Sequence, residues 1–179
     1  SQANVTIPES VISIENGAFA YSSSLTSIEV VGGNISYSSE DGVLFDKNKT
    51  VLIQFPAGKS GHYTIPDSVT SIGPAAFYGC KSLTSVTIPD SVITIGNEAF
   101  VECISLTTVT IPNPDCVIAD DAFDDSVTVI IGKPEPDVLA KPVIGKQEIE
   151  AVGVPGGSLT LAVEVLGEGL SYQWQKDGA

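Results

Sequence analysis

The side chains that could do chemistry in this 179-residue chain are few. His62 is the single histidine, so a hydrolytic triad or a histidine-ligated metal site would have to be built around it. It occupies the place that Ser85 and Thr108 take in later repeats of one pattern, and these are expected to point outward from strands. An exposed surface histidine is therefore a better interpretation than a catalytic base. We expect no catalytic residue and no enzyme activity.

Acidic side chains gather near the end of the repeated region: Asp120, Asp121, Asp124 and Asp125, then Glu135 and Asp137. Calcium prefers several carboxylate oxygens, but the D-x-D-x-D-G spacing of a calcium loop is missing. Runs of charge are usually solvated faces or end caps. We expect no metal and no cofactor, and calcium binding by Asp120–Asp125 stays open.

Three cysteines without a C-x-x-C pair indicate no disulfide framework. Cys80 and Cys103 hold equivalent places in successive repeats, where other repeats carry Ser22 and Ser126. We expect both to be small buried residues, although a disulfide between adjacent repeats is geometrically possible. Cys116 is out of phase and is expected to fill a local gap.

The net charge of the chain limits the classes of partner that it can bind. There are 22 acidic and 8 basic residues, a net charge of -14, and all the basic residues are lysines. Phosphate binding relies on Lys and Arg clusters, so nucleic acid and anionic membranes are disfavoured. No run approaches the roughly 18 apolar residues that span a bilayer. The N-terminal SQANVTIPES has neither the basic nor the apolar region of a signal peptide.

The elements that must position these side chains come from a 23-residue period. It is clearest in the series Thr64, Thr87, Thr110, then Phe77, Phe100, Phe123, then Leu83, Leu106, Val129. About five repeats follow, at 5–27, 28–62, 63–85, 86–108 and 109–132, and such a period is typical of a stacked solenoid. In repeat 28–62, two β-prone runs around Asp46-Lys47-Asn48-Lys49 predict an inserted hairpin, with Glu40-Asp41 and Asp46 as turn residues.

Each repeat is expected to begin with a strand of the pattern Leu83-x-x-Val86-x-Ile88, ended by Pro89. A short extended run at Val92 and Ile95 and a single helical turn near Phe100 complete the repeat. Stacking then predicts a buried column of Phe19, Phe77, Phe100 and Phe123, flanked by Ala18, Ala76, Ala99 and Ala122. The fold class is mainly β.

The pattern L-x-x-V-x-I-P-x-S-V-x-x-I-G-x-x-A-F-x-x-C resembles the BspA-type (Treponema-type) leucine-rich repeats. The resemblance covers residues 5 to about 132. It implies a secreted or surface-attached protein of bacteria, or of parasitic protists, that adheres to host proteins or other cells. No catalytic residues come with this resemblance.

We expect three domains: the solenoid at 1–132, a Pro- and charge-rich linker (KPEPDVLAKP) at 133–142, and residues 143–179. The last segment ends in SYQWQKDG, which resembles the third strand of a bacterial immunoglobulin-like domain with Trp174 in its core. Such a sandwich needs roughly 100 residues, so we expect an incomplete domain whose open edges associate with another surface or chain.

Outward residues of the main strands form a nearly uncharged, hydroxyl-rich strip, which we predict to be the ligand-binding surface: Ser27, Glu29, His62, Thr64, Ser85, Thr87, Thr108 and Thr110, after Asn4 and Thr6 at the N-terminal end.

The leading hypothesis is a non-enzymatic extracellular or cell-surface adhesion module that binds host matrix or other cell-surface proteins. The alternative is an accessory carbohydrate-binding or scaffolding module of a larger secreted enzyme, with an aromatic platform drawn from Tyr21, Tyr37, Tyr63 and Tyr78. Ice binding by the threonine ladder is disfavoured because Glu29 and His62 interrupt it. The expected partner is therefore an extracellular protein or a glycan, with no nucleic acid and no membrane insertion.

Overall fold

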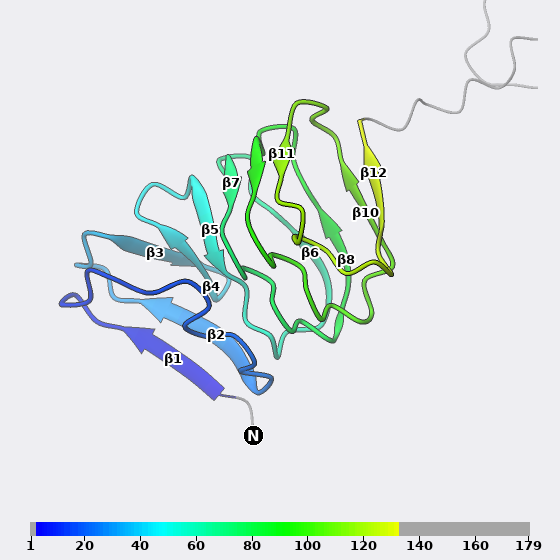
Figure 1. Cartoon of the computed structure of the whole chain (residues 1–179). Helices are drawn as coiled ribbons and strands as arrows, with labels where there is room; N and C mark the ends of the chain where they lie inside the picture. Colours follow the sequence, from blue (N-terminus) through cyan, green and yellow to red (C-terminus); the bar gives the residue numbers. More distant parts are fainter. Residues whose placement is uncertain (1–2, 133–179) are drawn as a thin grey trace, which may run out of the picture. The chain divides into compact units, whose positions relative to one another are not determined.

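The computed structural model describes residues 3–132, and all the regular elements in this range are β-strands (Figure 1). In chain order they are β1 (Ala3–Ile7), β2 (Leu25–Val30), β3 (Tyr37–Glu40), β4 (Val43–Asp46), β5 (Val51–Gln54), β6 (Gly61–Thr64), β7 (Ser71–Ile72), β8 (Leu83–Thr87), β9 (Thr94–Ile95), β10 (Thr108–Ile111), β11 (Val117–Ile118) and β12 (Thr128–Ile131). The predicted linker 133–142 and the predicted immunoglobulin-like segment 143–179 lie outside the described residues.

The chain winds as a solenoid in which each coil contributes to two strand arrays. The longer strands form the parallel pairs β1–β2, β6–β8 and β10–β12. The short strands β5, β7, β9 and β11 run parallel in a second sheet, which the antiparallel strands β4 and β3 extend (Figure 1). The mainly-β solenoid that the 23-residue period predicts is confirmed.

The insertion in the second coil contains two hairpins. The β4–β5 hairpin is the predicted one, and the carboxylate of Asp46 closes it by accepting hydrogen bonds from the backbone N–H groups of Thr50 and Val51 at 2.6 and 2.8 Å. The β3–β4 hairpin was not predicted, although its Asp41-Gly42 turn carries a strong sequence signal. Both turn residues have positive φ, of 49° and 74°, which the favoured two-residue hairpin turn requires.

The predicted helical turn around Phe100 is wrong. The backbone N–H of Phe100 bonds to the carbonyl of Ala122 in the next coil at 2.8 Å, and Phe77 N–H bonds to Ala99 in the same way. The N–H of Phe100 thus bonds to the next coil, whereas those of Ala99 and Val101 close single turns onto Gly96 and Glu98, so no continuous helical pairing forms. The expected burial still holds, because Ala99, Phe100 and Cys103 are at most 1% exposed.

The aromatic column is confirmed at three of its four positions. Phe77 and Phe100 stack with ring centroids 4.6 Å apart, and Phe100 and Phe123 with centroids 4.9 Å apart. The fourth ring is Phe55, whose centroid lies 5.1 Å from that of Phe77. Phe19 packs instead into a separate cluster around Ile28 and Leu44, and the neighbouring Ala18 is exposed. The insertion supplies its own phenylalanine to the second coil and so displaces the first coil from the column.

The last coil is shorter than the period implies. Val129 pairs with Val109, which is 20 residues earlier, so it does not occupy the place of Leu106. Consequently Ser126 is exposed and does not fill the small buried slot that Cys80 and Cys103 occupy. Those two cysteines are free and buried, as expected for packing residues, and Cys116 is free and half-buried against the core.

Candidate functional site

The candidate site is the outward face of the longer strands, where alternation separates core from solvent. Along β6 and β8, Tyr63, Leu83 and Val86 pack against the core, while His62, Thr64 and Thr87 are exposed. The register pairs His62 with Ser85 and Thr64 with Thr87, so residues one period apart lie side by side. The predicted phase of the strip is therefore confirmed on these strands.

His62 is the centre of a hydrogen-bonded group of four side chains. Its Nδ1 lies 2.8 Å from Ser85 Oγ, and its Nε2 lies 3.0 Å from Thr64 Oγ1 and 3.4 Å from Thr87 Oγ1. We call these four residues the His62 cluster. A neutral imidazole carries one donor and one acceptor nitrogen, and each hydroxyl can rotate to complement either, so the cluster is mutually satisfied without a charged group.

The His62 cluster is not arranged as a catalytic triad. In a triad, an acid holds the second ring nitrogen of the histidine in the correct tautomer, whereas the bonded partners of both nitrogens here are hydroxyls. Within residues 3–132, no three His, Cys, Asp or Glu side chains converge as metal ligands. What the cluster offers is a fixed array of donors and acceptors facing solvent.

The strip is not continuous, which corrects the expectation of five adjacent strands. The Asp41-Gly42 turn occupies the side of β2, where Ile28 N–H donates to Gly42 O at 2.9 Å. A Cβ built on Gly42 would lie 2.6 Å from Ser27 Oγ, so the turn partly covers Ser27. Ser27 Oγ in turn donates to Glu29 Oε1 at 2.5 Å. Ser27 and Glu29 therefore belong to a separate segment with Asn4 and Thr6, which are their register partners on β1.

The same turn places two acids next to β6. Burial raises the pKa of the Tyr63 hydroxyl, and the negative charges of Asp41 and Glu40 raise it further. Lys49 pairs with Glu40 at 2.5 Å, and Lys59 Nζ donates to the Asp41 carbonyl. The acidic turn is thus held on both sides by lysines, and its charges lie near Tyr63 of β6.

The far end of the strip lies on β10 and β12, which pair with each other but form no ladder with β8. Thr108 pairs with Thr128, and Thr110 with Ile130. Thr128 and Ile130 were missed because the 23-residue period places the last strand three residues too late. Thr108 is exposed and Thr110 half-buried, so both face outward as predicted.

Two of the aspartates that were considered as calcium ligands accept hydrogen bonds from the preceding coil. Asp121 Oδ1 accepts a hydrogen bond from Asn97 Nδ2 at 2.9 Å, and Asp124 Oδ2 accepts one from the backbone N–H of Glu102 at 2.8 Å. These carboxylates therefore connect adjacent coils. Glu135 and Asp137 lie outside the described residues.

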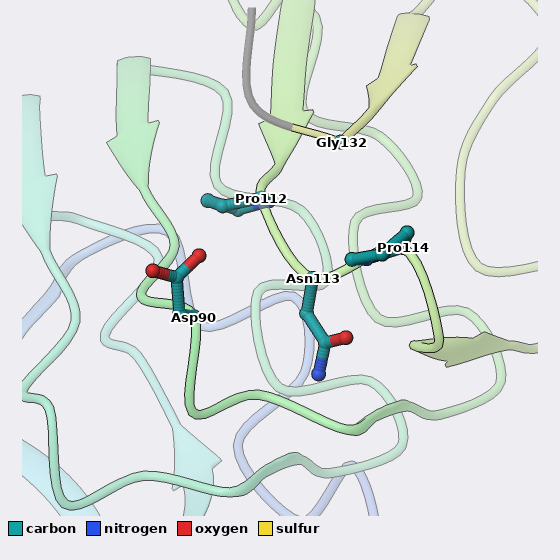
Figure 2. A pocket seen from close by; sticks show the side chains of 5 residues that line it. All are labelled: Asp90, Pro112, Asn113, Pro114 and Gly132. Atoms are coloured by element: carbon teal, nitrogen blue, oxygen red, sulfur yellow. The ribbon is translucent and has the colours of Figure 1, made fainter.

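A hollow of about 460 Å³ lies where three strands end. It is lined by Asp90 after β8, by Pro112, Asn113 and Pro114 after β10, and by Gly132 after β12 (Figure 2). The amide of Asn113 is engaged, since its Nδ2 donates to Val92 O at 3.1 Å and its Oδ1 accepts from Asp115 N–H. We assign no site there, because the amide of Asn113 is engaged and the described lining offers no convergent set of polar groups.

These features define a class: a β-solenoid of stacked repeats with a ladder of buried phenylalanines and a polar strand face. The chain matches the BspA type leucine rich repeat region in six copies over residues 1–60 and 54–131, and it belongs to that family. The six copies are one more than the five repeats predicted. No curated protein matches the chain.

Solved structures agree with this assignment. A leucine-rich repeat protein from Eubacterium ventriosum is 34% identical over 72% of this chain and 32% of its own length, with a TM-score of 0.59. A leucine rich cell surface protein from Faecalibacterium prausnitzii is 26% identical over 74% of this chain and 48% of its own, with a TM-score of 0.55. The pneumococcal vaccine antigen PcpA is 24% identical over 72% of this chain and 38% of its own, with a TM-score of 0.54, and this similarity supports the fold alone. The chain thus spans less than half the length of each of these proteins.

Proposed function

We propose that this solenoid is a non-enzymatic adhesion module that acts outside the cell and binds a protein partner through β6, β8 and β10. The observation that carries the proposal is the His62 cluster, whose four polar side chains are held in register on paired strands. Side chains that are already ordered lose little rotamer entropy on binding, which is a main cost of forming an interface. Family membership and the F. prausnitzii cell surface protein support the extracellular location. Within residues 3–132 the structure has no helix that is long and apolar enough to span a bilayer.

The size of the strip determines what else must take part. Paired parallel strands lie about 4.8 Å apart. The strip consists of two such pairs, β6–β8 and β10–β12, which lie side by side without a ladder between β8 and β10. A standard interface buries about 800 Å² on each partner, which is more than this face provides. In this proposal the Asp41-Gly42 turn, whose acidic side chains lie near Tyr63 of β6, extends the surface. The binding surface therefore combines the strip with this acidic turn.

Charge favours one kind of partner. The chain carries a net charge of -14 and the strip is almost uncharged, so an approaching protein meets a neutral hydrogen-bonding face on a strongly acidic chain. A basic surface would be steered toward this chain, and the association would weaken as salt screens the attraction. We therefore propose a basic host-matrix or cell-surface protein as the ligand.

The test measures binding of the 179-residue chain to a panel of purified matrix proteins, including collagen, laminin and fibronectin, by surface plasmon resonance. A variant with Thr64→Glu and Thr87→Glu adds two charges to the His62 cluster. Its control, Thr70→Glu with Ile93→Glu, adds the same charge at exposed positions beside β7 and β9. Circular dichroism and thermal melting establish that both variants remain folded.

We expect saturable binding to at least one matrix protein, with the strip variant at least about tenfold weaker than the control, or about 1.4 kcal/mol. Equal losses in both variants would mean that net charge governs binding and that the strip has no particular role. If the strip variant bound as well as the unaltered chain, the site would have to lie elsewhere on the molecule.

A further inference from the structure

A second surface, on the first coil, combines an exposed aromatic ring with hydroxyls. A hollow of about 310 Å³ opens there, next to Tyr21, whose side chain is 65% exposed. It is lined by Ala3, Val5, Phe19, Tyr21, Ser22, Ser23, Ser24 and Leu25. One part of the lining is therefore apolar and another part is a row of three consecutive serines. Small-molecule sites with this combination of apolar walls and a few polar groups typically measure about 300–1,000 Å³.

The three serines have hydroxyls to offer. Within residues 3–132, the side chains of Ser22, Ser23 and Ser24 have no hydrogen-bond partner, and Ser23 and Ser24 are exposed. Their backbone is nevertheless fixed, because Ser22 O accepts from Leu25 N–H and Ser24 O accepts from Ala3 N–H, both at 2.8 Å. The hydroxyls are thus presented to solvent from an ordered turn.

The aromatic ring is equally well fixed. Tyr21 Oη lies 2.6 Å from Tyr78 Oη, and the two rings meet edge to face with centroids 4.8 Å apart. This hydrogen bond is the main reason that the pKa of Tyr78 is raised above its usual value. The contact joins the first coil to the third: a Cβ built on Gly17 would lie 3.7 Å from Ala75 Cβ. Tyr21 is therefore an exposed ring in a predefined orientation.

We propose that this hollow binds one neutral sugar unit of a glycan, with an apolar face of the sugar ring against Tyr21 and its hydroxyls bonded to Ser22, Ser23 and Ser24. A pyranose has this dual character, since one face carries C–H groups and its rim carries hydroxyls. An anionic sugar is disfavoured because the chain has a net charge of -14 and no arginine to pair with a carboxylate. The site lies on the first coil and shares no residue with the strip, so it goes beyond the protein-binding function proposed above.

The experiment uses the folded 179-residue chain with lactose, methyl α-mannoside and N-acetylglucosamine as neutral probes and glucuronic acid as the anionic probe. Saturation-transfer NMR detects binding, and calorimetry gives its affinity. We expect at least one neutral probe to bind and Tyr21→Ala to weaken it by about tenfold, the scale of one aromatic contact with its buried area. Tyr21→Phe keeps the ring and should retain most of the affinity. The Thr70→Glu, Ile93→Glu variant, changed at exposed positions outside the hollow, is the control for surface substitution.

Three outcomes would overturn the proposal: no neutral probe binds, Tyr21→Ala binds like the unaltered chain, or glucuronic acid binds as tightly as the best neutral probe. If Tyr21→Ala fails to fold, Ser24→Lys replaces it, since it projects a long side chain over the hollow from an exposed position. Unchanged sugar binding by a folded Ser24→Lys variant would equally count against the site. Measuring Tyr21→Ala against the matrix-protein panel as well separates failure of this site from failure of the strip.

Discussion

Replacing Phe100 by alanine should remove the middle of the aromatic stack and destabilise the solenoid strongly. Phe100 is fully buried, and its ring is nearly parallel to its two neighbours, at 10° to Phe77 and 3° to Phe123. Truncating a buried phenylalanine typically costs about 3–5 kcal/mol, because transfer free energy is lost and a cavity remains. Phe100 has well-packed coils on both sides that cannot collapse into that cavity. We therefore expect the upper half of this range.

Two further variants provide reference values for the destabilisation expected of Phe100→Ala. Phe123 is half-buried and has one described ring neighbour, so Phe123→Ala should cost about half as much as Phe100→Ala. Thr87→Ala, at an exposed strand position, should change stability by no more than about 0.5 kcal/mol. Since small domains are stable by about 5–15 kcal/mol, the Phe100 variant should remain measurable but marginal.

The assay is urea unfolding of the 179-residue chain, followed by far-ultraviolet circular dichroism. The free energy of unfolding should rank with the unaltered chain close to Thr87→Ala, then Phe123→Ala, then Phe100→Ala. If Phe100→Ala were no less stable than Thr87→Ala, the ring stack could not be the core. If Phe123→Ala were the least stable, stability would reside at the end of the array.

Two further predictions test the insertion and the buried thiols. Gly42→Ala should destabilise the chain more than Gly61→Ala does, by about 1–3 kcal/mol. Both glycines have positive φ, but a Cβ at Gly42 would lie 2.6 Å from Ser27 Oγ, whereas a Cβ at Gly61 would meet open space. Equal urea midpoints for the two variants would contradict the packing of the hairpin turn. In the native protein a thiol reagent should label Cys116 alone, with Cys80 and Cys103 reacting only in denaturant. A thiol hydrogen bond to Cys103, together with burial, raises the pKa of Cys80, and burial raises the pKa of Cys116. Labelling of native Cys116 should therefore be slow at neutral pH and accelerate as the pH rises. Rapid labelling of all three thiols in the native protein would refute the assigned burial.

Repetition in the sequence was sufficient to predict the solenoid. Apolar residues that recur every 23 positions must bury the same face in every coil, so the positions of Phe77, Phe100, Ala99 and Cys103 in the core followed from spacing alone. The β4–β5 hairpin was equally local, because its strands flank a short polar turn. Such features depend on residues close in the chain or on an exact repeat, and both are visible in one dimension.

Features that depended on contacts between coils, or on the different lengths of the coils, were decided only by the tertiary structure. The turn near Phe100 resembles a helical turn locally, but its N–H bonds to Ala122 of the next coil, and a sequence pattern does not show which partner a backbone group will take. Phe55 entered the column in place of Phe19 because the insertion changed the spacing of the second coil.

The candidate site shows the same division. Alternation along the strands correctly predicted that His62, Thr64 and Thr87 face solvent, because side chains of a strand alternate between its two faces. Their union into one hydrogen-bonded cluster depends on the register between β6 and β8, and the break in the strip depends on where the Asp41-Gly42 turn packs. Both the register and the position of the turn relate segments that are far apart in the chain, and only the folded backbone determines how such segments lie.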